Sequence, residues 1–60
     1  MGSVQTARQM LREYGDRAEE ECESRASYHE IEGDREAARR WRSLKQTIAQ
    51  LRRAGGGNAG

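Results

Sequence analysis

The clearest pattern of apolar positions lies in the second half of the chain. Its members are spaced four, three, four and three residues apart: Ala37, Trp41, Leu44, Ile48 and Leu51. This spacing places all five side chains on one face of an α-helix, as is typical of a helix that packs against another helix. The pattern therefore predicts a helix over about residues 34–53.

The residues around this segment agree with its predicted ends. Asp34 follows Gly33 and is a favourable N-cap, because its carboxylate can accept hydrogen bonds from the first free backbone N–H groups. Arg52 and Arg53 lie in the last turn, where cations are favoured by the helix dipole. Gly55 is the expected C-cap.

A second and less regular apolar face precedes Gly33. Its positions recur every three or four residues: Ala7, Leu11, Tyr14, Ala18, Cys22, Ala26 and His29. They predict helix over about residues 4–32, but a glycine inside a helix costs about 1 kcal/mol relative to alanine. Residues 4–32 therefore form either one long helix weakened at Gly15, which the pattern favours, or two helices that meet there.

These elements predict an all-α fold, an antiparallel helical hairpin that turns at Gly33. A helix of about 20 residues is about 30 Å long, so the segment 34–53 reaches back only to about residue 13. Four apolar residues then lie beyond the end of the hairpin: Val4, Ala7, Met10 and Leu11. A continuous first helix must cover them with a second copy or another protein, whereas a bend at Gly15 lets them cap the hairpin as a short third helix.

The two halves of the predicted hairpin carry opposite charge. Residues 13–32 hold eight acids against two bases, a net of −6, and residues 34–53 hold seven bases against two acids, a net of +5. Complementary segments of this kind are most simply explained as partners of each other. In an antiparallel register, Glu19 to Glu23 face Arg42 and Lys45, and Glu13 approaches Arg53.

The size of the chain argues for a partner. The chain has 60 residues, of which 33% are apolar and 35% charged. A domain of this length buries only about 60% of its unfolded surface, so its core is small. We expect one domain over residues 1–54, a flexible glycine-rich tail over 55–60, and dimerisation into a bundle. The expected contact surface comprises Val4, Ala7, Met10, Leu11 and Tyr14.

Tyr28 and Ile31 lie slightly off the main apolar face, next to the predicted turn. We expect them to close the core there. The alternative is a second apolar surface for a partner.

No motif in the sequence predicts catalysis, a cofactor or a metal. Cys22 and His29 are seven residues apart, without the paired short spacings of zinc ligands or an activating base and third group. We therefore expect a non-enzymatic helical protein-protein interaction module, self-associating or a subunit of a larger assembly. The alternative is a small nucleic-acid-binding regulator that uses the basic second helix, through Arg39, Arg40, Arg42 and Lys45.

The chain shows no apolar run that predicts a signal peptide or a membrane span, so we expect a cytoplasmic protein. Ten arginines against one lysine suggest a GC-rich bacterial genome. The stretch Tyr14-Gly15-Asp16-Arg17-Ala18, followed by Gly33-Asp34 and the helix with Trp41, resembles a group of short bacterial helical proteins. The resemblance covers roughly residues 7–53, and it implies a small helical fold without an assigned activity.

Overall fold

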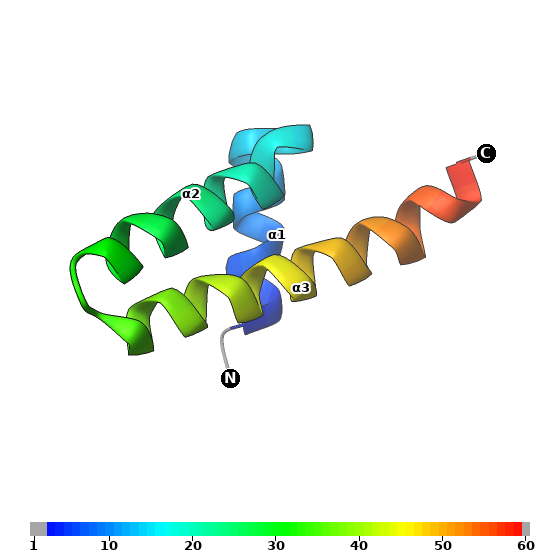
Figure 1. The fold of residues 1–60 in the computed structure, drawn as a ribbon. Helices are drawn as coiled ribbons and strands as arrows, with labels where there is room; N and C mark the ends of the chain where they lie inside the picture. The colour runs from blue at the N-terminus through cyan, green and yellow to red at the C-terminus, as the bar shows by residue number, and fades with distance from the viewer. Residues whose placement is uncertain (1–2, 60) are drawn as a thin grey trace.

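The computed structural model describes the backbone of residues 3–59 and the side chains of residues 4–54. The elements, in chain order, are α1 (Ser3–Tyr14), the short 3₁₀ turn η1 (Gly15–Arg17), α2 (Ala18–Ile31) and α3 (Arg35–Ala59). Helices α2 and α3 form an antiparallel hairpin, and α1 runs across it (Figure 1). The predicted all-α helical hairpin is thus confirmed.

The chain bends sharply at Gly15, and the single long helix favoured by the sequence pattern is wrong. Gly15 has a φ of +57°, a left-handed conformation that glycine adopts at little cost. After the η1 turn, α2 begins at Ala18. Its N-cap is Arg17, which makes no capping hydrogen bond through its side chain. The alternative of two helices meeting at Gly15 is the one the chain adopts.

The turn between α2 and α3 has the predicted chemistry. Gly33 has a φ of +88°, and its N–H donates to the carbonyl of Glu30 at 3.0 Å. The N–H of Asp34 donates to the carbonyl of His29 at 2.8 Å, which completes a Schellman motif. The Asp34 carboxylate in turn accepts the N–H of Ala37 at 3.1 Å. Asp34 is therefore the N-cap of α3, as predicted.

Helix α3 is longer than the sequence pattern indicated. It continues through Gly55 to Ala59, so the predicted end near residue 53 and the predicted cap at Gly55 are wrong. No proline interrupts this segment, and glycine weakens a helix without forbidding its backbone angles. The predicted flexibility of the tail 55–60 stays a prediction, since its side chains and residue 60 lie outside the described residues.

The core lies where α1 crosses the hairpin. Five residues from all three helices are buried together: Ala7, Met10, Ala18, Cys22 and Ile48. Five larger side chains pack partly buried around them: Leu11, Tyr14, Trp41, Leu44 and Leu51. The contribution of α2 consists of small residues, which let the neighbouring helices approach its backbone closely. Nearer the turn, the buried positions are again small, Ala26 and Ala38.

Tyr28 and Ile31 do not close the core near the turn, contrary to expectation. Tyr28 is 62% exposed and Ile31 is 86% exposed. The buried residues near the turn are instead the small Ala26 of α2 and Ala38 of α3. Ile31 is five residues beyond Ala26, which places it on the opposite side of α2.

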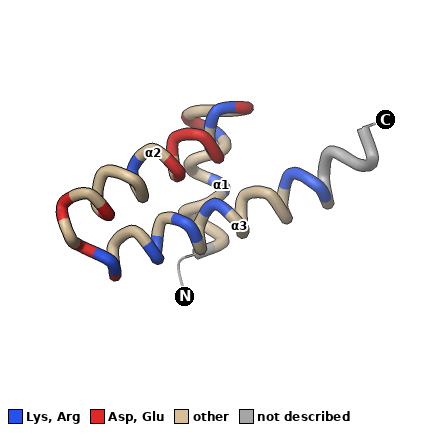
Figure 2. Tube along the Cα trace, in the orientation of Figure 1, with Lys and Arg blue, Asp and Glu red and all other residues tan. Residues whose placement is uncertain are grey.

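Acidic residues gather on α2 and basic residues on α3 (Figure 2), and ion pairs join the two helices, as the charge pattern predicted. Glu23 binds Arg42 at 3.3 Å and Lys45 at 3.1 Å, and Glu30 binds Arg42 at 2.9 Å. At the far end Arg52 binds Glu19 at 3.3 Å and Asp16 at 3.4 Å. Exposed pairs of this kind contribute about 0.2–1 kcal/mol each, so their main effect is to select one register.

Candidate interaction surface

The structure places most of the predicted contact residues of α1 against the hairpin of the same chain. Ala7 is fully buried and Met10 is 7% exposed, while Leu11 and Tyr14 are partly buried against the same core. Val4, at 48%, is the most exposed of the five. The bend at Gly15 turns α1 back onto the hairpin, so the overhang expected of a continuous first helix does not form, and the alternative of a short helix against the hairpin is the one adopted. Ala7 and Met10 are not accessible to a partner in this fold.

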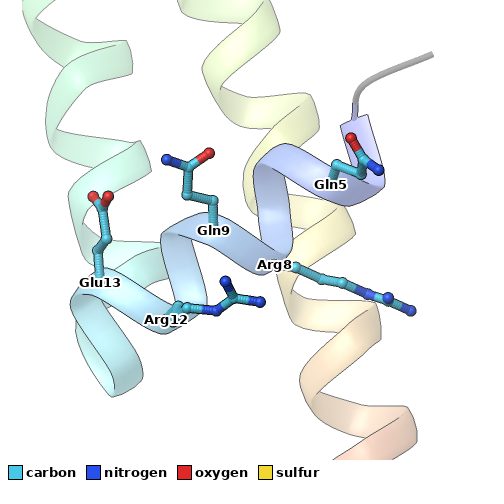
Figure 3. A pocket seen from close by; sticks show the side chains of 5 residues that line it. All are labelled: Gln5, Arg8, Gln9, Arg12 and Glu13. Carbon is cyan, nitrogen blue, oxygen red and sulfur yellow. The ribbon is translucent and has the colours of Figure 1, made fainter.

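The outward face of α1 is polar. Gln5, Arg8, Gln9, Arg12 and Glu13 line a shallow depression of about 440 Å³ on this face. In Figure 3, Arg8 and Arg12 extend to one side of the helix, and Gln9 and Glu13 extend to another. These side chains diverge and offer no apolar anchor. The face has the character of a solvated surface.

An apolar groove lies on α3, on the side of the hairpin that α1 covers only in part. Ala37, Arg40, Trp41 and Leu44 line about 310 Å³ of it. A second hollow of about 280 Å³ shares Arg40 and Leu44 and is also lined by Thr6 and Ser43. The two hollows together are called the α3 groove below. It runs from the turn end of α3 to the flank of α1.

Arg25 lies against the ring of Trp41. Its guanidinium carbon lies 5.0 Å from the centre of the Trp41 ring and 5.9 Å from that of Tyr14. The same guanidinium donates to the Tyr14 hydroxyl at 3.0 Å and to the Glu21 carboxylate at 3.0 Å. The hydrogen bond to Glu21 is the largest cause of the raised pKa of Arg25. Arg25 thus holds α1, α2 and α3 together and fixes the orientation of Trp41 beside the groove.

The four basic residues proposed for nucleic acid do not form one surface. Arg42 and Lys45 pair with Glu23, and these hydrogen bonds, first that from Lys45, lower the pKa of Glu23. Arg39 lies with Arg42 in a hollow of about 220 Å³ that also contains Glu30. Arg40 instead lines the α3 groove. Two of the four charges are therefore neutralised within the fold, and the other two belong to different hollows.

Cys22 and His29 both pack against other side chains of the fold. Cys22 is fully buried in the core, and this burial raises the pKa of its thiol, which keeps the sulfur neutral and unreactive. The His29 ring packs edge-on against Tyr28, with ring centres 5.6 Å apart. Among the described residues, no three His, Cys, Asp or Glu side chains gather in a way that could hold a metal ion.

The chain matches no protein-family model, no curated protein and no solved structure. Within the described residues, none of the helices is both long and apolar enough to cross a membrane.

Two features of these surfaces escaped the sequence reasoning. The α3 groove contains Trp41 and Leu44, which the apolar spacing predicts on the face packed against another helix, yet both are only partly buried. The contact of Arg25 with Trp41 was also not predicted. The available signal was the lone arginine within the acidic stretch 19–32, a position that the helical pattern places beside the apolar face of α2.

Proposed function

We propose that this protein is a non-enzymatic protein-protein interaction module whose contact surface is the α3 groove. The observation that carries the proposal is the accessible apolar lining of this groove by Ala37, Trp41 and Leu44, with Arg40 beside them. Tryptophan and arginine are over-represented among the residues that dominate binding energy at protein interfaces. The apolar face of α1 is already buried in the core of the same chain, whereas the groove is accessible.

The groove favours a partner segment with apolar and acidic side chains. An amphipathic helix can lay an apolar residue against Trp41 and Leu44, as in other complexes in which a helix binds in a groove. Arg40 makes no ion pair with another described residue, so its charge is available to a partner carboxylate. An acidic residue beside the apolar anchor therefore adds charge complementarity and specificity.

Site-specific photo-crosslinking in cells that produce the full chain tests this function. A photoreactive benzoylphenylalanine replaces Ser43, which is exposed and lines the groove. The expected result is a discrete covalent adduct, to a second copy or to another polypeptide, identified by mass spectrometry. The matched control places the same residue at Gln9 on the polar face of α1, where no adduct is expected. Equal or absent crosslinking at the two positions would contradict the proposal.

Nucleic-acid binding is the second candidate, supported by the exposed Arg35 and Arg39 on one face of α3, which make no ion pair with described residues. It requires an affinity for duplex DNA or RNA that falls steeply with salt, because arginine-phosphate contacts release counterions. A gel-shift assay over a range of salt concentrations, with Arg39→Gln beside the unchanged chain, tests it. Binding that is absent at every salt concentration would rule it out.

A further inference from the structure

The end of α2 exposes two large apolar side chains beside an acid. Tyr28 and Ile31 are 62% and 86% exposed, and they lie three residues apart on neighbouring positions of the helix surface. Glu32 follows directly, is exposed, and makes no ion pair with a described residue. These three residues are called the α2 knob below. Exposed apolar groups of this size, next to each other at one end of a small molecule, are typical of a contact surface.

The α2 knob has the chemistry that the α3 groove favours. The groove offers the apolar surfaces of Ala37, Trp41 and Leu44, with the cationic Arg40 on its wall. The knob offers an aromatic and an aliphatic side chain, with the anionic Glu32 beside them. The two surfaces are therefore complementary in both polarity and charge.

The knob cannot fill the groove of its own chain. Cys22 and Ala26 mark the face of α2 that is buried in the molecule. At 100° per residue, Ile31 lies on roughly the opposite side of the helix from Cys22. Its side chain therefore points away from α3 of the same chain, and only a second molecule can bring such a knob into the groove.

We propose that the α3 groove binds the α2 knob of a second copy of this chain. This inference rests on the proposed function and names the partner of the same surface. In a twofold-symmetric dimer each copy donates its knob and receives the other, so every contact is made twice. Glu32 of each copy meets Arg40 of the other, so the charges beside the knob and the groove are paired at both contacts.

The available area limits the strength of this dimer. The molecule exposes 4687 Å² in all. A standard interface uses about 800 Å² per partner, whereas the knob comprises three residues and the groove is lined by six. We therefore expect a reversible dimer with a dissociation constant on the order of 10–100 µM, in the range of small transient interfaces.

Sedimentation equilibrium of the purified full chain, from 5 µM to 1 mM loading concentration, measures the dimerisation. Ile31→Glu places a charge in the knob at a position that is 86% exposed in the single chain, so its fold is preserved. This substitution is expected to weaken the dimer at least about tenfold, since an unpaired charge would be buried. Val4→Glu changes another exposed apolar residue, outside both surfaces, and is expected to leave the dimer unchanged.

Charge reversal tests whether the knob and groove meet each other. Arg40→Glu and Glu32→Arg alone are each expected to weaken the dimer about three- to tenfold, because each places like charges together across the interface. The double variant restores opposite charges at both contacts and is expected to recover most of the original affinity. Recovery would show that positions 32 and 40 face one another between copies.

Three results would overturn the dimer. The first is that the unchanged chain is entirely monomeric at 1 mM. The second is a dimer that Ile31→Glu does not weaken. The third is a double charge-reversal variant whose dimer is weaker than that of either single variant. If the Ser43 crosslink then joins a different polypeptide, the proposed interaction function holds while the second copy is excluded as its partner. If the Ser43 crosslink also fails, both proposals fail together.

Discussion

Arg25 contacts both an acid on its own helix and aromatic residues of the two other helices. It lies in a segment of net negative charge, where an arginine is expected to pair with a neighbouring acid, and it does pair with Glu21 at 3.0 Å. Its guanidinium also lies over Trp41 and hydrogen-bonds to Tyr14. A planar guanidinium can stack and donate at the same time, which a lysine ammonium cannot. One residue on α2 therefore contacts side chains from both other helices.

The buried thiol of Cys22 should be protected from alkylation in the folded protein. Burial raises its pKa and removes it from solvent, so the native protein should react with iodoacetamide far more slowly at pH 8 than the chain unfolded in guanidinium chloride. The measurement is the rate of mass increase in the two conditions. A native rate close to that of the unfolded chain would show that Cys22 is accessible.

The three helices owe their ends and directions to two glycines in left-handed conformations. Gly33 closes α2 through the Schellman hydrogen bonds and leads into the Asp34 cap, so local chemistry alone explains that turn. Gly15 has no such set of signals around it. Its φ of +57° separates α1 from α2 and directs α1 across the hairpin instead of along the axis of α2.

The conformation of Gly15 can be tested by substitution. Gly15→Ala places a Cβ in open space, so no clash arises, but the left-handed φ is unfavourable for alanine. We expect a loss of about 1–2 kcal/mol in the free energy of unfolding, measured by urea denaturation. Gly15→Asn should lose less, because asparagine tolerates this region better. A more stable Gly15→Ala variant would indicate a continuous helix.

The ion pairs between α2 and α3 predict an acid dependence. Hydrogen bonds from Lys45 and Arg42 lower the pKa of Glu23 from its ordinary 4.5, and Arg42 likewise lowers that of Glu30. The unfolded chain therefore binds protons at a higher pH than the folded chain does. The stabilisation is complete above about pH 4.5 and is lost as the pH falls through the lowered folded values.

Thermal unfolding followed by circular dichroism between pH 7 and pH 2.5 measures this dependence. The unchanged chain should lose stability on acidification, and the double variant Glu23→Gln/Glu30→Gln should lose less over the same range. Glu20→Gln is the matched control, since Glu20 is exposed and makes no ion pair with a described residue. Equal acid dependence in all three proteins would argue against a role for the interhelical pairs.

At the scale of the whole molecule, α1 decides which surfaces remain for function. Its apolar face covers the open end of the hairpin and completes the core around Ile48. The α3 groove stays accessible, from Ala37 near the turn to Thr6 on the flank of α1. The small core of the chain is thus shared by three helices, and the surface left for a partner lies on α3 and at the end of α2.

Truncation of one core residue tests the docking of α1. Met10→Ala removes a buried side chain and should lower the free energy of unfolding by about 2–3 kcal/mol. Val4→Ala, on the same helix but 48% exposed, should change it by no more than about 0.5 kcal/mol. Denaturant unfolding of both variants measures the difference. Equal small effects would mean that α1 is not packed against the hairpin.

Local patterns in the sequence were sufficient for helix on both sides of Gly33, for the turn itself and for the pairing of α2 with α3, but not for the break at Gly15 or the end of α3. The apolar spacing, the Gly33-Asp34 pair and the opposite charges act between near neighbours or along aligned helices, so each can be inferred without a structure. The Asp34 cap and the pairing of Glu23 with Arg42 and Lys45 confirm this.

The path of α1 and the nature of the exposed surface were decided by the tertiary structure. The apolar face of α1 is equally compatible with burial against its own hairpin and with burial against a second molecule, since periodicity says nothing about what covers it. The sequence marks Gly15 only as a possible break, and the left-handed φ that it adopts selects the first. Tyr28 and Ile31 are exposed because α3 packs against the face of α2 that carries Cys22 and Ala26, and which face is covered is decided by the two helices together.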